Sequence, residues 1–148
     1  MIITTCSDHS CEEAVLEAFV HHVSLATSDL PRALAFYCGV LGLKQIHRPE
    51  LSNAGAWLKT GASQIHLIDY PDGTFRRKSV IDNHDVHYAL RVADFEAAVQ
   101  ELAEKGYRED AGENDPKRVL VKRKSPVGFP QIYLLDPDQH VVEINAAA

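Results

Sequence analysis

The chain contains one pattern twice, and this internal repeat constrains the fold more than any other feature. His22-Val23-Ser24-Leu25 leads, seven residues beyond the histidine, to Asp29-Leu30, and His87-Tyr88-Ala89-Leu90 leads over the same distance to Asp94-Phe95. After each acidic residue, apolar side chains recur at helical spacing until a glycine. Two copies of a strand–helix unit, each opening on a histidine, predict two similar modules with a shared site where they meet.

The rest of each half predicts further strands, so the expected order is βαβββ twice, with extra material in the second copy. Alternating apolar residues and turn signals indicate strands at 19–27, 43–48, 55–59, 64–69, 86–92, 107–110, 117–124, 129–135 and 141–145. Ser28 or Asp29 should cap the first helix, which ends near Gly39 and Gly42, and Asp94 the second, which ends at Lys105. The segment 117–124 has the charges of an exposed edge strand.

The length of 148 residues fits a single domain, 1–148. Its modules should span about 19–73 and 85–146, joined by the loop 74–83, with an N-terminal extension at 1–18. Ser10 could cap a short helix at 11–19. The extension also holds Cys6, His9 and Cys11, which could form a small metal site, although a loosely held terminus is the better interpretation.

Composition excludes several classes of partner. A formal net charge of −6 and a pI near 5.7 argue against nucleic acid. No apolar run approaches the roughly 20 residues that cross a bilayer, and the N-terminal residues lack the pattern of a signal peptide. Three cysteines without paired spacing predict no disulfide framework. We therefore expect a cytoplasmic protein that binds a small molecule, without nucleic-acid or membrane partners.

Four residues are candidate metal ligands. Because alternate strand residues share a face, His22 lies with small neighbours on one face of its strand, and so does His87. His66 and Glu143 lie in otherwise apolar strands, where such side chains are unusual unless they are paired. Three imidazoles and a carboxylate suit Ni, Zn, Co, Mn or Fe(II).

One ambiguity concerns His66. Strand order matches it to Glu143, since both should lie in the last strand of a module. However, Gln64-Ile65-His66-Leu67 also resembles Gln131-Ile132-Tyr133-Leu134, and that alignment would match His66 to Tyr133 instead.

Between Val20 and Asn145 the chain resembles the vicinal oxygen chelate superfamily. This superfamily includes glyoxalase I, fosfomycin-resistance thiol transferases, methylmalonyl-CoA epimerase, extradiol dioxygenases and bleomycin-resistance proteins. The resemblance rests on the two repeats above, on Ala35-Phe36-Tyr37 through Val40-Leu41-Gly42-Leu43, and on Leu135-Asp136-Pro137-Asp138 through Val142-Glu143-Ile144. It implies an α+β fold of paired βαβββ modules forming a half-open, eight-stranded, barrel-like sheet. It also implies a homodimer, a divalent metal ion and a substrate that chelates the metal through vicinal oxygens.

The resemblance implies that His22, His66, His87 and Glu143 ligate the metal and that Glu143 is the catalytic base. Glyoxalase I usually has Glu at the position of His66, and methylmalonyl-CoA epimerase has Gln. Gln139 also departs from the family, which usually has Gly there, and this predicts a relaxed hairpin.

A glyoxalase-like lyase or isomerase is the preferred function. The alternatives are an Fe(II)-dependent extradiol-type dioxygenase using His22, His87 and Glu143, and a non-catalytic binding protein of the bleomycin-resistance type. Thiol transfer to fosfomycin is disfavoured, because phosphonate-binding relatives usually have a basic residue where this chain has Val142.

Several other residues could lie near the site. The basic cluster at 117–124 could hold an anionic substrate tail, although a solvated strand face is the simpler interpretation. Trp57 and Phe129 could line the pocket, but aromatic residues on such strands more often belong to the core. Alternation predicts that His21 points away from His22 and is not a ligand.

Overall fold

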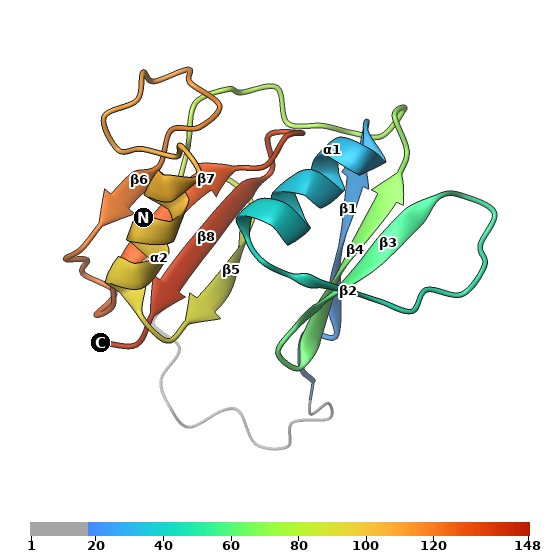
Figure 1. Ribbon diagram of the computed structural model, residues 1–148, viewed down its shortest axis with the longest axis horizontal. Coiled ribbons are helices and arrows are strands. Elements are labelled where there is room, and N and C mark those ends of the chain that lie inside the picture. The colour runs from blue at the N-terminus through green and yellow to red at the C-terminus, as the bar shows by residue number, and fades with distance from the viewer. Residues whose placement is uncertain (1–17) are drawn as a thin grey trace, which may run out of the picture.

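The computed structural model describes residues 18–148 and contains two βαβββ modules (Figure 1). The first module consists of β1 (His22–Thr27), α1 (Leu30–Leu34), the π-helix η1 (Ala35–Val40), β2 (Lys44–Ile46), β3 (Gly55–Thr60) and β4 (Ser63–Asp69). The second consists of β5 (His87–Val92), α2 (Phe95–Glu104), β6 (Leu120–Lys122), β7 (Gln131–Leu135) and β8 (Val141–Ala146). The predicted repeat is therefore confirmed. The helix and the metal site considered for the N-terminal extension fall mainly or wholly on residues 1–17, outside the described residues.

Each module forms its own four-stranded mixed sheet, and the two sheets do not close into a barrel. The strand orders are β1-β4-β3-β2 and β5-β8-β7-β6, so β1 and β5 are corresponding edge strands. In each sheet the first strand pairs in parallel with the last, while the remaining pairs are antiparallel. The predicted edge position of the strand near residue 120 is also confirmed, because β6 is the outer strand of its sheet.

Aspartate caps start both helices as predicted. Asp29 accepts a hydrogen bond from the backbone N–H of Arg32, and Asp94 accepts one from that of Ala97. The first helix differs from the expected single α-helix, because it changes after Leu34 into the π-helix η1. The Leu41 N–H bonds to the Phe36 carbonyl five residues back, 3.0 Å away, which is the π-helical spacing.

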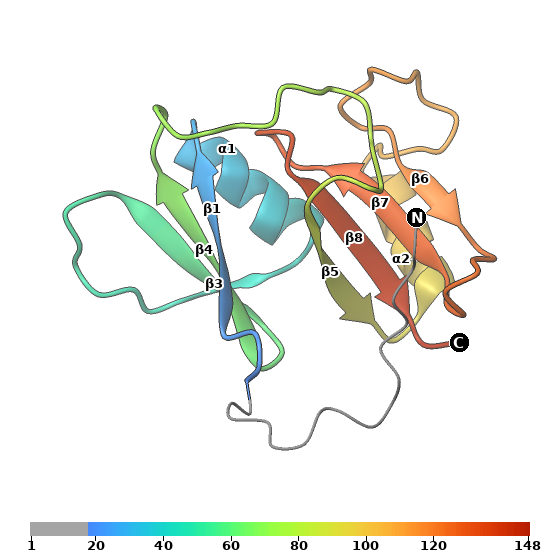
Figure 2. The same cartoon turned by 180° about the vertical axis from the view of Figure 1, so that it is seen from behind.

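One hydrophobic core joins the modules. Figures 1 and 2 show α1 and η1 between the two sheets, with α2 against the sheet of the second module. Both sheets contribute to one contiguous cluster of buried side chains, including Leu58, Leu67, Ile132 and Val142. The core therefore takes one face of each sheet, while the opposite face of the second sheet carries Glu143 together with a smaller apolar cluster of Tyr133, Leu135 and Val141. None of the helices among residues 18–148 is long and apolar enough to cross a bilayer.

The predicted strand at 107–110 is wrong. Arg108 forms only an isolated parallel bridge with Arg118. The intervening residues are occupied by a turn in which the Arg118 N–H bonds to the Asp115 carbonyl. The charged neighbours of Arg108 offer no apolar alternation to extend the ladder.

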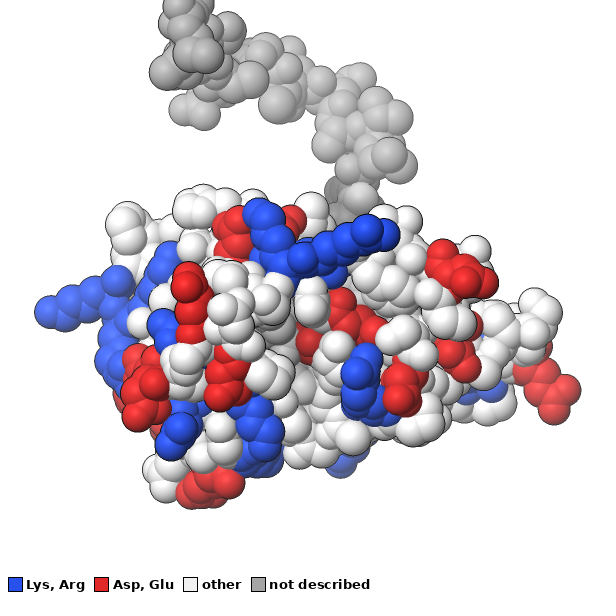
Figure 3. Space-filling view, turned by 90° about the horizontal axis from the view of Figure 1, so that it is seen from above, with Lys and Arg blue, Asp and Glu red and all other residues white. Residues whose placement is uncertain are grey.

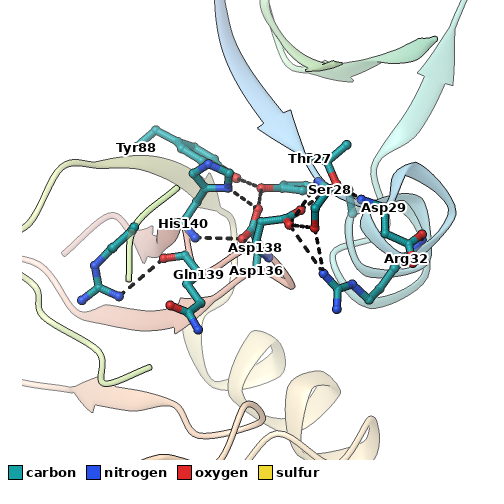
Figure 4. A network of polar contacts seen from close by, with 11 residues as sticks. Thr27, Ser28, Asp29, Arg32, Tyr88, Asp136, Asp138, Gln139 and His140 are labelled. Atoms are coloured by element: carbon teal, nitrogen blue, oxygen red, sulfur yellow. Dashed lines mark hydrogen bonds and ion pairs between the residues drawn. The ribbon is translucent and has the colours of Figure 1, made fainter. Parts of the chain in front are cut away.

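The turn between β7 and β8 fastens the second module to the first. Asp138, which is buried, accepts hydrogen bonds from the side chains of Thr27 at 2.6 Å and Ser28 at 2.5 Å (Figure 4). Asp136, also buried, accepts one from the Tyr37 hydroxyl at 2.7 Å and one from the His140 ring at 2.8 Å. Such charge-assisted bonds are about twice as strong as neutral ones. Both carboxylates are thus satisfied across the module boundary.

The turn is tight rather than relaxed, contrary to the expectation from Gln139. The Gln139 N–H bonds to the Asp136 carbonyl at 2.9 Å, and Gln139 has a φ of 70°, in the left-handed region that favours glycine. The flanking pairing and the buried aspartates hold this geometry despite the side chain.

We predict that Gln139→Gly stabilises the protein, because it removes a left-handed non-glycine residue. The free energy of unfolding should rise by about 1 kcal/mol in urea denaturation. The matched control is Gln100→Gly on α2, which should lower it by about 1 kcal/mol. A loss of stability in Gln139→Gly would contradict the strain assigned to this turn.

We also predict a pH-dependent contribution from His140. Burial alone would lower its pKa, but the hydrogen bond and charge of Asp136, with the charge of Asp138, raise the pKa above its ordinary value. The stabilisation is therefore complete below the unfolded pKa of about 6.5 and is lost as the pH rises through the folded pKa. Against His140→Asn, which keeps an N–H donor but cannot titrate, the wild type should be more stable by about 1 kcal/mol at low pH. A difference that stays constant from about pH 6 to pH 9 would contradict this assignment.

Candidate metal centre

The first pair of predicted ligands lies on the face of the first sheet that points away from the core. His66 is in register with Ser24, so its ring lies beside that of His22, with the ring centroids 4.1 Å apart and the planes 10° from parallel. Trp57, the partner of His66 on β3, also stacks on it, at 4.3 Å and 7°. Trp57 is therefore part of this site and not of the core.

A hydrogen bond to Gln64 and the surrounding burial and charges determine the chemical state of His66. Its Nε2 lies 2.8 Å from the side-chain oxygen of Gln64, which can only accept, so Nε2 carries the proton and Nδ1 is the nitrogen left to bind. Burial, followed by the charges of His22, His21 and Arg48, lowers the pKa of His66. The neutral imidazole thus favoured is the form that ligates metals.

His21 does not point away from His22, and that prediction is wrong. The Nδ1 atoms of the two rings lie 2.9 Å apart. The reason is that β1 begins at His22, so the alternation of a strand does not extend to the preceding residue.

The second pair lies on the second sheet, where the two side chains are in contact. His87 Nε2 is 3.2 Å from a carboxylate oxygen of Glu143, and His87 Nδ1 is 2.7 Å from the Asp85 carbonyl, to which it donates. The contact between Nε2 and the Glu143 carboxylate requires a proton on the ring nitrogen or a cation between the two atoms. Ligands about 2.0–2.2 Å from a tetrahedral metal lie roughly 3.4 Å apart, so the pair fits.

Glu143 is held in the charged form. Burial alone would raise its pKa, but hydrogen bonds from Asn145, Gln131 and Tyr133, with the charge of His87, keep its pKa below the usual range. One oxygen accepts from Asn145 at 2.8 Å and from Gln131 at 3.1 Å, while the other faces His87. The carboxylate is therefore both ionised and oriented at neutral pH.

Tyr133 completes this cluster. Burial and the nearby Glu143 charge raise the pKa of Tyr133 to about 12, so its hydroxyl stays protonated. This hydroxyl accepts a hydrogen bond from Gln131 at 2.7 Å and directs its own proton to Glu143. Lys122, from the basic cluster at 117–124, lies 5.5 Å from the Tyr133 ring.

The other members of that basic cluster have different partners. Arg123 forms ion pairs with Glu96 and Glu109, away from Glu143. Phe129, which the sequence also suggested for the pocket, packs against Arg91 instead: its ring centroid lies 5.0 Å from the guanidinium carbon. A substrate-binding role for the cluster as a whole stays a prediction. Lys122 is the member that lies beside Tyr133, a neighbour of Glu143.

The two pairs occupy equivalent positions in the two modules. His66 is in register with Ser24 and Glu143 with Ala89, in each case two residues after the first-strand histidine. His66 therefore corresponds to Glu143 and not to Tyr133. Within residues 18–148 of one chain, however, no three His, Cys, Asp or Glu side chains gather closely enough to hold a metal ion. The predicted ligands lie as two separate pairs, each of which would supply one half-site of a metal centre.

Several supporting residues were not predicted from the sequence. Gln64, Gln131, Asn145 and Asp85 all contact a predicted ligand. Gln64 and Asn145 were detectable, because each lies two residues from a ligand on the same strand and therefore on the same face. Gln131 lies on a neighbouring strand, and the Asp85 contact uses a backbone carbonyl, which has no sequence signal.

Comparison with known proteins gives one superfamily for this chain. The family model for the glyoxalase/bleomycin resistance protein/dioxygenase superfamily matches residues 19–144. A protein named Glyoxylase I 4 from Arabidopsis thaliana is 30% identical over 127 residues, covering 84% of this chain and 68% of that protein. The glutathione transferase FosA of Serratia marcescens is 29% identical over 131 residues, covering 87% and 81%. A glyoxalase family protein from Bacillus anthracis superposes with a TM-score of 0.69 at 22% identity, covering 88% and 96%.

The chain therefore belongs to the glyoxalase/bleomycin resistance protein/dioxygenase superfamily. This superfamily includes enzymes such as glyoxalase I and FosA, and its members typically use divalent metals and often form dimers.

Proposed function

We propose that this protein is a metal-dependent, glyoxalase-like lyase or isomerase acting in the cytoplasm on a small substrate with vicinal oxygens. The observation that carries the proposal is the matched placement of two donor pairs, His22 with His66 and His87 with Glu143, at the same register of two repeated modules. Three imidazoles and one carboxylate suit Ni, Zn, Co, Mn or Fe(II).

We further propose that the complete site forms between two copies of the chain. Each half-site lies at or beside an edge strand, β1 or β5, and an unpaired edge can be covered by another strand. In a two-fold dimer, β1 of one subunit would lie beside β5 of the other, so that each His22–His66 pair faces a His87–Glu143 pair. Two equivalent sites would result.

A bound divalent metal would supply Lewis-acid polarisation of a substrate carbonyl. Glu143 would take the proton from the hydroxyl-bearing carbon beside the carbonyl and deliver it to the carbonyl carbon. The hydroxyl proton would pass to the former carbonyl oxygen, so the isomerisation balances without a redox partner. Its ionised state and its orientation by Asn145 and Gln131 support this role.

A three-ligand dioxygenase site is the second candidate, and the contacts of His66 favour it. His66 is stacked between His22 and Trp57 and is also bonded to Gln64, so it could remain in this arrangement without binding metal. His22, His87 and Glu143 would then form an Fe(II) triad. Anaerobic Fe(II) loading followed by oxygen uptake with catechols tests this candidate, and the absence of uptake excludes it.

We predict that two inactive variants restore metal binding when mixed. His22→Ala/His66→Ala and His87→Ala/Glu143→Ala should each bind almost no metal, because each lacks one half of every site. After unfolding and joint refolding, half of the dimers are mixed and each carries one intact site, so the metal content should reach about a quarter of the wild-type value. Each variant refolded alone is the control. A mixture that binds no more metal than its components would contradict the shared site.

We predict that Glu143→Gln lowers kcat by at least about 100-fold, because the amide cannot accept the proton. The first substrate to assay is the hemithioacetal of methylglyoxal and glutathione, with the bound metal measured on the same sample. Glu104→Gln on α2 is the control. Full turnover by a metal-loaded Glu143→Gln would refute the base assignment. A metal-free wild type that binds a drug tightly would instead support the non-catalytic alternative.

A further inference from the structure

A cavity separate from the predicted metal ligands lies beside the turn between β7 and β8. Its volume is about 390 Å³, within the range of small-molecule sites. None of the four predicted ligands lines it. Its walls come from α1, from the β7–β8 turn and from the loops that contain Ser79 and Asn114. The aromatic and apolar part of the wall includes Tyr107 and Leu135.

The cavity has unbalanced positive charge. Arg32 and Lys117 line it, and the one acidic lining residue is Asp136. The Asp136 carboxylate is already occupied by Tyr37, by His140 and by two backbone N–H groups. Lys117 makes no ion pair with any carboxylate of residues 18–148, and its nearest acceptor is the Lys105 carbonyl at 3.3 Å.

Arg32 is only partly neutralised. Its side chain is 52% exposed, and one nitrogen lies 3.5 Å from Asp138, whose oxygens are engaged by Thr27 and Ser28. Figure 3 looks down on the end of the molecule that carries the loops, where basic and acidic side chains are interspersed rather than gathered into a large patch of one sign. The two cations of the cavity are therefore a local feature.

Gln139 adds an acceptor without a partner. Its side-chain oxygen is buried and is the one such side-chain atom among the described residues that forms no hydrogen bond. Figure 4 shows its amide outside the network of dashed lines around Asp136 and Asp138. Gln139 lines the cavity, and the terminal torsion of an amide side chain is broad, so this oxygen is free to reorient. A buried acceptor is costly to leave unsatisfied.

We propose that this cavity binds a small organic anion that also carries a hydroxyl or amine donor, with the anion between Arg32 and Lys117 and the donor on Gln139. Ser79 donates to the side-chain oxygen of Asn114 at 2.9 Å, which joins the two loops at the rim and leaves the Asn114 amide nitrogen as a further donor. The site is independent of the metal centre and of the reaction proposed above.

Isothermal titration calorimetry of the full-length wild type with sn-glycerol 3-phosphate tests the proposal. Two matched probes serve as comparisons. Glycerol has the hydroxyl groups but no charge, and inorganic phosphate has the charge but no carbon-bound hydroxyl group. We expect glycerol 3-phosphate to bind saturably, phosphate more weakly and glycerol not at all. Arg32→Met and Lys117→Met should each weaken binding by about tenfold or more, and Gln139→Leu by about threefold to tenfold.

Two control variants show whether the probe binds in this cavity or elsewhere on the protein. Lys44→Met removes a lysine that does not line the cavity and should leave the affinity unchanged, as should His87→Ala at the predicted metal centre. No saturable binding up to about 10 mM, near the weak limit of specific recognition, would overturn the proposal. Binding that is lost in His87→Ala but retained in Arg32→Met and Lys117→Met would also overturn it, because the probe would then occupy the metal centre.

Discussion

The parallel pairing of the first and last strands in each module is the constraint on which the candidate site depends. It places His66 beside the β1 histidine and Glu143 beside the β5 histidine, with the same two-residue offset. A shift of one residue in either register would place His66 or Glu143 on the core face of its sheet. The strand neighbours of His66 and Glu143 are apolar and buried. The shift is prevented because it would move these neighbours out of the core. The same side-chain pattern thus forms the core and directs the donors away from it.

The second constraint is the polar network at the module boundary. Asp136 and Asp138 lie in one tight turn and receive hydrogen bonds from Tyr37, Thr27 and Ser28 of the first module. Because removing one partner leaves a buried charge unsatisfied, this network holds the modules in one orientation. That orientation keeps the His22–His66 pair separate from the His87–Glu143 pair within residues 18–148 of one chain.

Local patterns predicted much of this fold. The aspartate caps and the order of helices and strands along the chain follow from spacing within a few residues, so they were visible in the sequence. The π-helix was not, since apolar spacing does not separate it from an α-helix. The hydrogen bond between Tyr37 and Asp136 joins residues 99 positions apart, and no local pattern predicts it. The left-handed Gln139 likewise depends on the tertiary contacts of its neighbours. The sequence singles out the four candidate ligands, but their division into two pairs depends on how the modules pack.

X-ray absorption of the metal-loaded, untagged, full-length protein tests the central claim most directly. We expect about three imidazoles and one carboxylate around the metal, with nitrogen and oxygen ligands at roughly 2.0–2.2 Å. A sulfur ligand at about 2.3 Å, or no more than one imidazole, would contradict the four-ligand site, because the metal would then be bound by residues other than His22, His66, His87 and Glu143.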